Sequence, residues 1–243
     1  MISKNQLKLI RALGQKKYRK QHNQYLVQGE KNVLELLASG LTIIDIFATA
    51  AFIAQFQQQF THVNMIEADE DVLTKASTLV SNNAAIAIVD MPTASAPQAS
   101  GLILALDGVS DPGNLGTIIR VADWYGIKHI VTSTDSADAY NPKTISATMG
   151  SFVRVSVSQV ELPAYLSGLN LPIYGAFLDG KSVHKTQFTG QGVLLMGSES
   201  HGIRQACAAL VTDKITIPAF GGAESLNVAM ATGIILDNFK RQA

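Results

Sequence analysis

Cysteine is nearly absent from this chain of 243 residues, and Cys207 is its only example. A single cysteine can form neither an intramolecular disulfide nor a zinc cluster, so a reducing cytoplasm is the expected compartment. The histidines show no metal-ligand spacing, and we therefore expect no metal site. No run of eighteen apolar residues occurs, which argues against a membrane-spanning helix.

Charged residues are also sparse at 16% of the chain, whereas hydrophobic residues make up 47%. This balance excludes a disordered or fibrous protein and predicts one or two domains, each with a buried core. The N-terminal stretch MISKNQLKLIRALGQKK is basic and amphipathic, and it lacks both an apolar segment and a cleavage site. We therefore expect no secretory signal and no association with a membrane.

The net charge is zero, but the charges are unevenly distributed. Residues 1–31 contain eight lysines or arginines and one acid, whereas the rest of the chain contains 11 basic and 18 acidic residues. A segment of charge +7 before a body of charge −7 is typical of an arm that binds nucleic-acid phosphates. Alternatively, the basic residues of this segment form a solvated helix face that binds no nucleic acid. The residues that we expect to contact RNA there are Lys16, Lys17, Arg19 and Lys20.

Apolar stretches of strand length alternate with stretches of helical periodicity along most of the chain. This alternation predicts sheets covered by helices. Residues 91–101, MPTASAPQASG, interrupt it with two prolines among small polar residues, so we place a linker there with a domain boundary near residue 95. The resulting prediction is a substrate-binding domain at 1–94 and a catalytic domain at 95–243.

Strands at 102–106, LILAL, and 193–197, VLLMG, are apolar throughout rather than alternating. They predict a parallel sheet covered on both faces, in which ligands bind beyond the carboxyl ends of the strands. Elsewhere we predict a helix that begins after Ser3, a polar connection at 15–23 and a closing helix from Ser225 to Arg241. Three loops that follow strands have unusual sequences and are the candidate site.

The first loop lies in LDGVSDPGNLGTIIR, residues 106–120. Its Pro-Gly pair predicts a turn, and Asn114 can cap the helix that follows. Arg120 interrupts an apolar helical run, where an unpaired charge is costly. It either serves a ligand or forms an ion pair with a nearby aspartate. The three candidates for that pairing are Asp107, Asp111 and Asp123.

The second loop lies in LLMGSESHGIR, residues 194–204. Glu199 and His201 offer polar side chains at a strand end, and the two glycines allow unusual backbone angles. A G-x-S-x-G nucleophile elbow is not present, because His201 stands where the second glycine should be. A histidine in such a position is more often a surface or capping residue than a catalyst.

The third loop lies in ITIPAFGGAESLNVAMATGIILD, residues 215–237. We expect Ser225 to cap the closing helix and Glu224 to be favoured near the positive end of its dipole. Capping alone would explain Ser225, but it explains the glycine pair and Asn227 less well. The small residues along the helix would permit tight packing against another element or a second subunit.

A dinucleotide fingerprint and a P-loop are both missing. In their order and spacing, the three strings instead resemble the signature motifs of the SpoU/TrmH family of RNA 2'-O-ribose methyltransferases, within the SPOUT superfamily. The stretch SADAYNPKTISATMGSFVRV resembles the family's intervening region. The N-terminal residues 3–40 resemble the ribosomal-protein-like substrate-binding domain that often precedes the catalytic one.

This resemblance implies a C-terminal SPOUT-type α/β domain with a trefoil knot, preceded by a small ribosomal-protein-like α/β domain that binds RNA. It also implies S-adenosylmethionine as the methyl donor and a homodimer through the catalytic domain, in which Asn114 and Arg120 of one subunit complete the site of the other. The positions that correspond to the donor site are Gly197, Ile217, Leu226 and Asn227. The positions that correspond to catalytic residues are Asn114, Arg120, Glu199, Ser225 and Asn227, with Arg120 also contacting RNA.

One departure is the pair Ala229-Met230, where relatives commonly have a serine followed by a β-branched residue; the polar positions of the third motif are intact. The resemblance implies transfer of a methyl group from S-adenosylmethionine to a ribose 2'-hydroxyl in structured RNA, with ribosomal RNA favoured over transfer RNA. A catalytically silent RNA-binding protein of the same fold is the main alternative. A small-molecule enzyme with a nucleotide cofactor is a second one.

Overall fold

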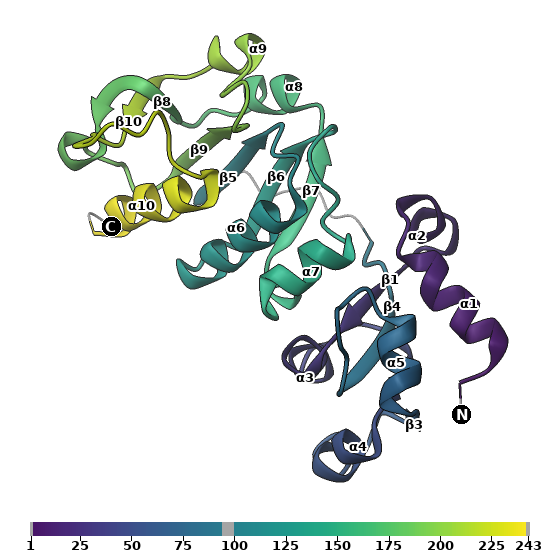
Figure 1. Cartoon of the computed structure of the whole chain (residues 1–243). Coiled ribbons are helices and arrows are strands. Elements are labelled where there is room, and N and C mark those ends of the chain that lie inside the picture. The colour runs from purple at the N-terminus through teal and green to yellow at the C-terminus, as the bar shows by residue number, and fades with distance from the viewer. Residues whose placement is uncertain (1, 94–99, 242–243) are drawn as a thin grey trace. The chain divides into compact units, whose positions relative to one another are not determined.

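The computed structural model describes residues 2–93 and 100–241. These residues form two compact units, residues 2–93 with Asp138–Val153 and residues 100–137 with 154–241 (Figure 1). The predicted boundary near residue 95 lies outside the described residues. The assignment of substrate binding to residues 1–94 and of catalysis to residues 95–243 therefore stays a prediction. The structure adds that Asp138–Val153 belongs to the first unit, which the sequence did not predict.

The first unit is built on a four-stranded sheet of order β1-β4-β2-β3, in which only the pair β2 and β3 is parallel. Its strands are β1 (Gln24–Gln28), β2 (Ile43–Ala48), β3 (Met65–Glu67) and β4 (Ala85–Asp90). Its helices are α1 (Lys4–Leu13), α2 (Lys16–His22), α3 (Glu30–Leu37), α4 (Ala50–Phe56), α5 (Glu70–Ala76) and α7 (Pro142–Thr148), with a 3-10 turn η1 at Ser151–Val153.

Both faces of this sheet are covered. Helices α1 and α5 bury side chains such as Leu13 and Leu73 on one face. Helices α3, α4 and α7 cover the other, where Ile145 of α7 joins the core. The rings of Tyr25 in β1 and Tyr140 lie 4.8 Å apart, so the segment Asp138–Val153 is an integral part of this unit.

The predicted helix after Ser3 is confirmed, because Ser3 and Gln6 form a capping box at the start of α1. The predicted polar connection at 15–23 is wrong, since α2 occupies Lys16–His22. A run of basic residues predicts a solvated segment, but the Arg19 side chain is 1% exposed and holds the helix against the rest of the unit.

The second unit is built on a six-stranded sheet of order β10-β8-β9-β5-β6-β7, and every strand pair in it is parallel. The parallel sheet predicted from the apolar strands is therefore confirmed. Its strands are β5 (Leu102–Asp107), β6 (His129–Ser133), β7 (Ser156–Val160), β8 (Ile173–Ser182), β9 (Gly192–Gly197) and β10 (Asp213–Thr216). Its helices are α6 (Pro112–Trp124), α8 (Leu162–Ser167), α9 (Gln205–Ala208) and α10 (Val228–Lys240), with a 3-10 turn η2 at Val183–Lys185.

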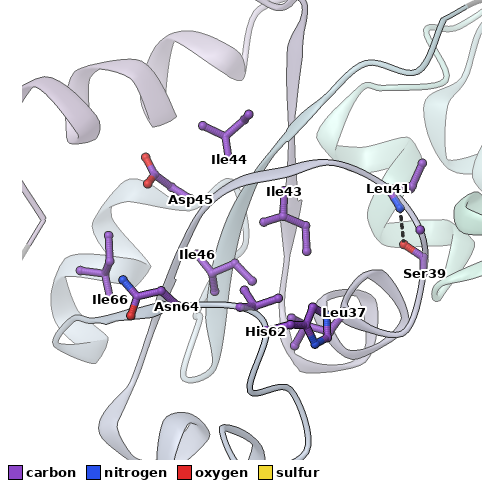
Figure 2. Close-up of a pocket in the computed structure, with 12 residues that line it drawn as sticks. Leu37, Ser39, Leu41, Ile43, Ile44, Asp45, Ile46, His62, Asn64 and Ile66 are labelled. Atoms are coloured by element: carbon purple, nitrogen blue, oxygen red, sulfur yellow. Dashed lines mark hydrogen bonds between the residues drawn. The ribbon is translucent and has the colours of Figure 1, made fainter.

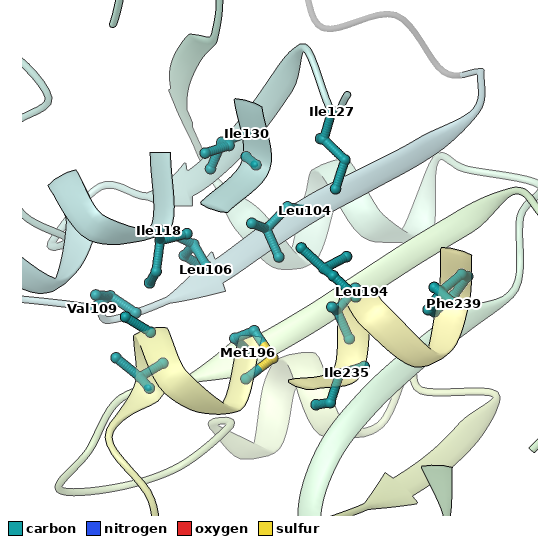
Figure 3. Packing of buried hydrophobic residues seen from close by; sticks show 14 of the residues in the cluster. Leu104, Leu106, Val109, Ile118, Ile127, Ile130, Leu194, Met196, Ile235 and Phe239 are labelled. Atoms are coloured by element: carbon teal, nitrogen blue, oxygen red, sulfur yellow. The ribbon is translucent and has the colours of Figure 1, made fainter. Parts of the chain in front are cut away.

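Helices cover both faces of this second sheet as well. On one face α6 and α10 pack beside each other, and Ile118 and Ile235 meet Leu104 and Leu194 of the central strands (Figure 3). On the other face, α8 and α9 bury Leu166 and Cys207. No helix in the described ranges is long and apolar enough to cross a membrane. The trefoil knot that the resemblance implies stays a prediction.

Candidate functional site

The three loops singled out in the sequence follow three strands of the second sheet. Strand β5 leads into the first loop, β9 into the second and β10 into the third. Strands β5 and β9 are direct neighbours, with Asp107 opposite Gly197 at their carboxyl ends. The parallel arrangement therefore opens the first two loops at the same edge of the sheet.

Side chains from all three loops meet in one hydrogen-bonded cluster. Asn114 Nδ2 donates to Glu199 Oε1 over 2.5 Å, and Asn227 Nδ2 donates to the same oxygen over 3.3 Å. Asn227 Nδ2 also donates to Asn114 Oδ1 over 3.0 Å. Within the described part of the chain, no protein donor bonds Glu199 Oε2, so this carboxylate can still accept a hydrogen bond from a ligand.

Two helix caps explain how the asparagines take part in this cluster. The predicted cap at Asn114 is wrong: Asp111 caps α6 by accepting from Asn114 N, which leaves the Asn114 side chain available to Glu199. The predicted cap at Ser225 is also wrong. Helix α10 begins at Val228, and Asn227 Oδ1 accepts from Ala229 N and Met230 N. The Asn227 amide group is thus fixed by its own helix while Nδ2 reaches the cluster.

The second loop turns back on itself immediately after β9. Ser198 and Gly202 form an isolated β-bridge, with N–O distances of 3.1 and 2.9 Å. A Cβ on Gly197 would lie 2.1 Å from the carbonyl carbon of Gly202, so only glycine fits there. The bridge holds Glu199 at the tip of a tight turn. His201 is exposed, and among the described residues it bonds only its neighbour Ser200 and, through its backbone, Ser198.

Arg120 lies on the exposed side of α6 and has no hydrogen-bond or ion-pair partner in the described ranges. The structural alternative of an ion pair with a nearby aspartate is wrong, because each candidate has another role. Asp107 binds Arg204, Asp123 binds Arg154 and Asp111 caps α6. An arginine left without a protein partner is available to a negatively charged ligand.

The remaining predicted donor positions lie around the third loop. Ile217 is half-buried just after β10, whereas Ser225 and Leu226 are exposed. No described hydrogen bond joins Ser225 to the asparagine–glutamate cluster. The structure thus brings Asn114, Glu199 and Asn227 together, and it leaves Arg120 and Ser225 outside that cluster.

The predicted RNA-contacting residues divide into two groups. Lys16, Lys17 and Lys20 are exposed on α2. The prediction for Arg19 is corrected, because its guanidinium is buried and forms a 2.6 Å ion pair with Asp138. It also donates to the Leu13 and Gly14 carbonyls over 2.9 Å each. A buried and paired guanidinium cannot reach a phosphate, so Arg19 is a structural residue.

The first unit also contains a surface pocket of about 450 Å³ beside the start of β2 (Figure 2). Its walls combine apolar side chains such as Ile43 and Ile46 with the polar groups of Asp45, His62 and Asn64. None of the three motif loops contributes to it. In residues 2–93 and 100–241, no group of three or more histidines, cysteines or carboxylates could hold a metal ion.

Sequence reasoning missed a charged network next to the cluster. The buried carboxylate of Asp107 accepts hydrogen bonds from Arg204, which also pairs with Asp135 over 2.9 Å. The sequence does contain one signal for it: Asp107 ends an apolar strand, and a carboxylate that is buried there needs a cation as its partner.

Comparisons with known proteins find matches for both units. The family model described as the SpoU rRNA Methylase family matches residues 101–237, and the model of an MRM3-like substrate binding domain matches residues 4–87. The 23S rRNA (guanosine(2553)-2'-O)-methyltransferase RlmP of Bacillus subtilis is 30% identical over 239 residues, which cover 96% of each protein.

Solved structures give the same result. A TrmH-family protein from Porphyromonas gingivalis has 39% identity and a TM-score of 0.89, with 100% of both chains covered. An AdoMet-bound rRNA methyltransferase from Sinorhizobium meliloti has 28% identity and a TM-score of 0.86, and the match covers 99% of this chain and 97% of the other.

Proposed function

This chain belongs to the SpoU rRNA methylase family, and we propose that it transfers a methyl group from S-adenosylmethionine to a ribose 2'-hydroxyl of ribosomal RNA. The observation that carries this proposal is the convergence of Asn114, Glu199 and Asn227, one from each motif loop, into a single cluster. Separate structural roles for the three loops would not require them to meet.

The residues at the strand ends fit the methyl donor. The tight turn at Gly197 brings backbone groups to the edge of the sheet, and Leu226 exposes 49% of its surface at the third loop. An apolar side chain and backbone groups suit the adenosine of S-adenosylmethionine, which supplies a methyl group on a sulfonium centre. Gly197, Ile217, Leu226 and Asn227 are the residues that would hold it.

The chain must align the ribose and promote loss of its proton, because a 2'-hydroxyl is a weak nucleophile. Arg120 is a poor base, since a guanidinium keeps its proton at any physiological pH. Its guanidinium, which has no partner among the described residues, would instead bind the neighbouring phosphate and stabilise the developing alkoxide, with the proton leaving through that phosphate or a water. Glu199 would fix the loop around the donor, and Ser225 and Asn227 would orient Arg120 or the ribose.

A homodimer through the second unit would place Arg120 in the site of the other subunit. Arg120 and Trp124 lie one helical turn apart on the exposed face of α6. Trp124 is 84% exposed, and Met230 on the adjacent helix α10 is 63% exposed. A second copy of this chain that packed against α6 and α10 would cover both side chains.

The dimer can be tested with the chain's single tryptophan. Burial of Trp124 between subunits would shift its fluorescence emission to shorter wavelength with rising protein concentration, in parallel with a doubling of mass by light scattering. Trp124→Glu should give a monomer that transfers no methyl groups. A monomeric native protein with full activity would exclude the shared site.

RNA binding is assigned to the first unit, where the exposed lysines of α2 would contact phosphates. The relatives named above support ribosomal RNA as the substrate. The cytoplasm is the compartment that we propose. Titration of the protein with S-adenosylmethionine tests the alternative of a silent RNA-binding protein, which would bind no donor. Comparing 2'-O-methyl positions in ribosomal and transfer RNA with and without the gene identifies the product. Unchanged methylation of both RNAs would refute the function.

A further inference from the structure

Asp107 and Arg204 join the first and second motif loops. The Asp107 side chain is fully buried at the end of β5. Arg204 N donates to its Oδ2 over 2.7 Å, and Arg204 Nε donates to its Oδ1 over 2.7 Å. Arg204 Nη2 also donates to Oδ1. Both oxygens of one buried carboxylate therefore accept hydrogen bonds from Arg204.

This pair closes the second loop at its base. The loop leaves β9 at Gly197, which is paired with Asp107 in the strand register. It returns at Arg204, whose backbone and side chain both bind the Asp107 carboxylate. The two ends of the loop are thus held by the backbone and the side chain of one residue. Glu199 lies at the loop's tip, where it accepts from Asn114 and Asn227.

A second carboxylate fixes the direction of the Arg204 fork. Arg204 Nη1 donates to Asp135 Oδ2 over 2.9 Å, and Nη2 donates to Asp135 Oδ1 over 3.2 Å. The Ser133 hydroxyl and then the Arg204 guanidinium hold the pKa of Asp135 below its usual value. Burial, followed by the charge of Asp107, raises the pKa of the Cys207 thiol to about 11, so no second negative charge forms beside Asp107 at neutral pH.

A role in stability alone explains this arrangement poorly. Burial of the Asp107 carboxylate carries a desolvation cost that its pairing with Arg204, whose side chain is 46% exposed, has to offset, so the pair adds little stability over apolar side chains of the same size. What a planar guanidinium between two carboxylates does provide is a fixed direction, because its N–H groups point along set lines. The element whose direction is fixed here is the loop that carries Gly197 and Glu199.

We propose that Arg204 is a positioning residue for methyl-donor binding, which it supports by holding the loop from Gly197 to Ile203 closed on Asp107. This inference rests on the proposed methyltransferase function. Arg204 acts through the loop, and it contacts neither the ribose nor the transferred methyl group. The lysine variant keeps the charge and the backbone bond but loses the fork, so it should loosen the loop without unfolding the sheet.

The test compares Arg204→Lys with the native protein by calorimetric titration of S-adenosylmethionine, steady-state kinetics and amide hydrogen exchange. We expect the donor Kd and the donor KM to rise about tenfold or more, as loss of one well-placed charged hydrogen bond predicts. The kcat at saturating donor and the Kd for RNA should stay within about twofold. Amides at 198–203 should exchange faster in the variant.

Arg154→Lys is the matched control. Arg154 also forms an ion pair in the second unit, with Asp123, and its side chain is 46% exposed, as is that of Arg204. It lies in neither motif loop, so its lysine variant should leave the donor Kd unchanged. Asp135→Asn provides a second variant that spares the buried pair, and it should raise the donor Kd by about threefold because it removes one exposed ion pair.

The outcomes separate this inference from the function on which it rests. No donor binding by the native protein would refute both. Donor binding by the native protein, with the same Kd in folded Arg204→Lys, would refute only the role of Arg204. If Arg204→Lys fails to fold, Asp135→Asn decides, and an unchanged donor Kd in that variant overturns the proposal. Equal losses in Arg204→Lys and Arg154→Lys would also overturn it, because the effect would then not depend on the loop.

Discussion

Asn227 Nδ2 donates to Asn114 Oδ1, although 113 positions separate these residues in the sequence. The same side chain caps α10 through Oδ1 and reaches Glu199 through Nδ2. One amide group thus begins a helix and joins the loops that follow β5 and β9. The two roles use different atoms, so substitution can separate them.

Asn227→Ser should keep the cap and lose the bridge. Serine caps helices about as well as asparagine, but its short side chain has no amide to bond Asn114 and Glu199. We expect methyl transfer to fall about tenfold to a hundredfold, in line with loss of a hydrogen bond to a charged group. The melting temperature should change little. Asn227→Ala removes both functions and should cost about 1 kcal/mol more in stability. Full activity in Asn227→Ser would show that the bridge is dispensable.

Arg120→Ala should lower the rate of methyl transfer by at least about a hundredfold. The donor Kd measured by calorimetry should stay unchanged. The reason is that Arg120 has no described protein partner to lose and would act only on the RNA. Arg120→Lys should recover part of the activity, since it keeps the charge without the planar fork. Arg154→Ala serves as the control and should remain active. A weakened donor Kd in Arg120→Ala would place this residue at the donor instead.

The central strands of the six-stranded sheet in the second unit could be predicted from sequence because their signal is local. LILAL and VLLMG are buried on both faces of the sheet, and an uninterrupted apolar run of strand length predicts such burial. The first two motif loops follow such strands, so the edge where these two meet could be predicted too, whereas the third loop follows β10, which is largely exposed. The parallel order of the sheet places the loops of Asn114 and Glu199 side by side, whereas the approach of Asn227 depends on the path of the third loop.

The pairings could not be predicted in the same way. Ser225 is a good capping residue by type, but Asn227 caps α10 because its amide also finds partners on two distant loops. The role of Arg204 could not be predicted because its partner, Asp107, lies 97 positions earlier in the sequence. The segment Asp138–Val153 follows β6 in the sequence, yet it joins the core of the first unit. Each of these depends on tertiary geometry that no short window of sequence contains.

The exposed lysines of α2 should control the salt dependence of RNA binding. Removing one lysine–phosphate interaction lowers the slope of log K against log salt by about 0.7 to 0.9. Replacement of Lys16, Lys17 and Lys20 by alanine should therefore flatten the slope by about two units or more, measured by fluorescence anisotropy with a ribosomal RNA fragment. Lys75→Ala, at an exposed lysine on α5, is the control. An unchanged slope in the triple variant would move the RNA-binding surface elsewhere.

Arg19 should behave differently from these lysines, although it lies on the same helix. Arg19→Met leaves Asp138 without its cation and should cost about 3 kcal/mol in the free energy of unfolding measured with urea. Adding Asp138→Asn removes the unpaired charge and should restore part of that loss. Under conditions where Arg19→Met is folded, its salt slope for RNA should equal that of the native protein. A flatter slope with unchanged stability would return Arg19 to the RNA-binding surface and make the ion pair with Asp138 incidental.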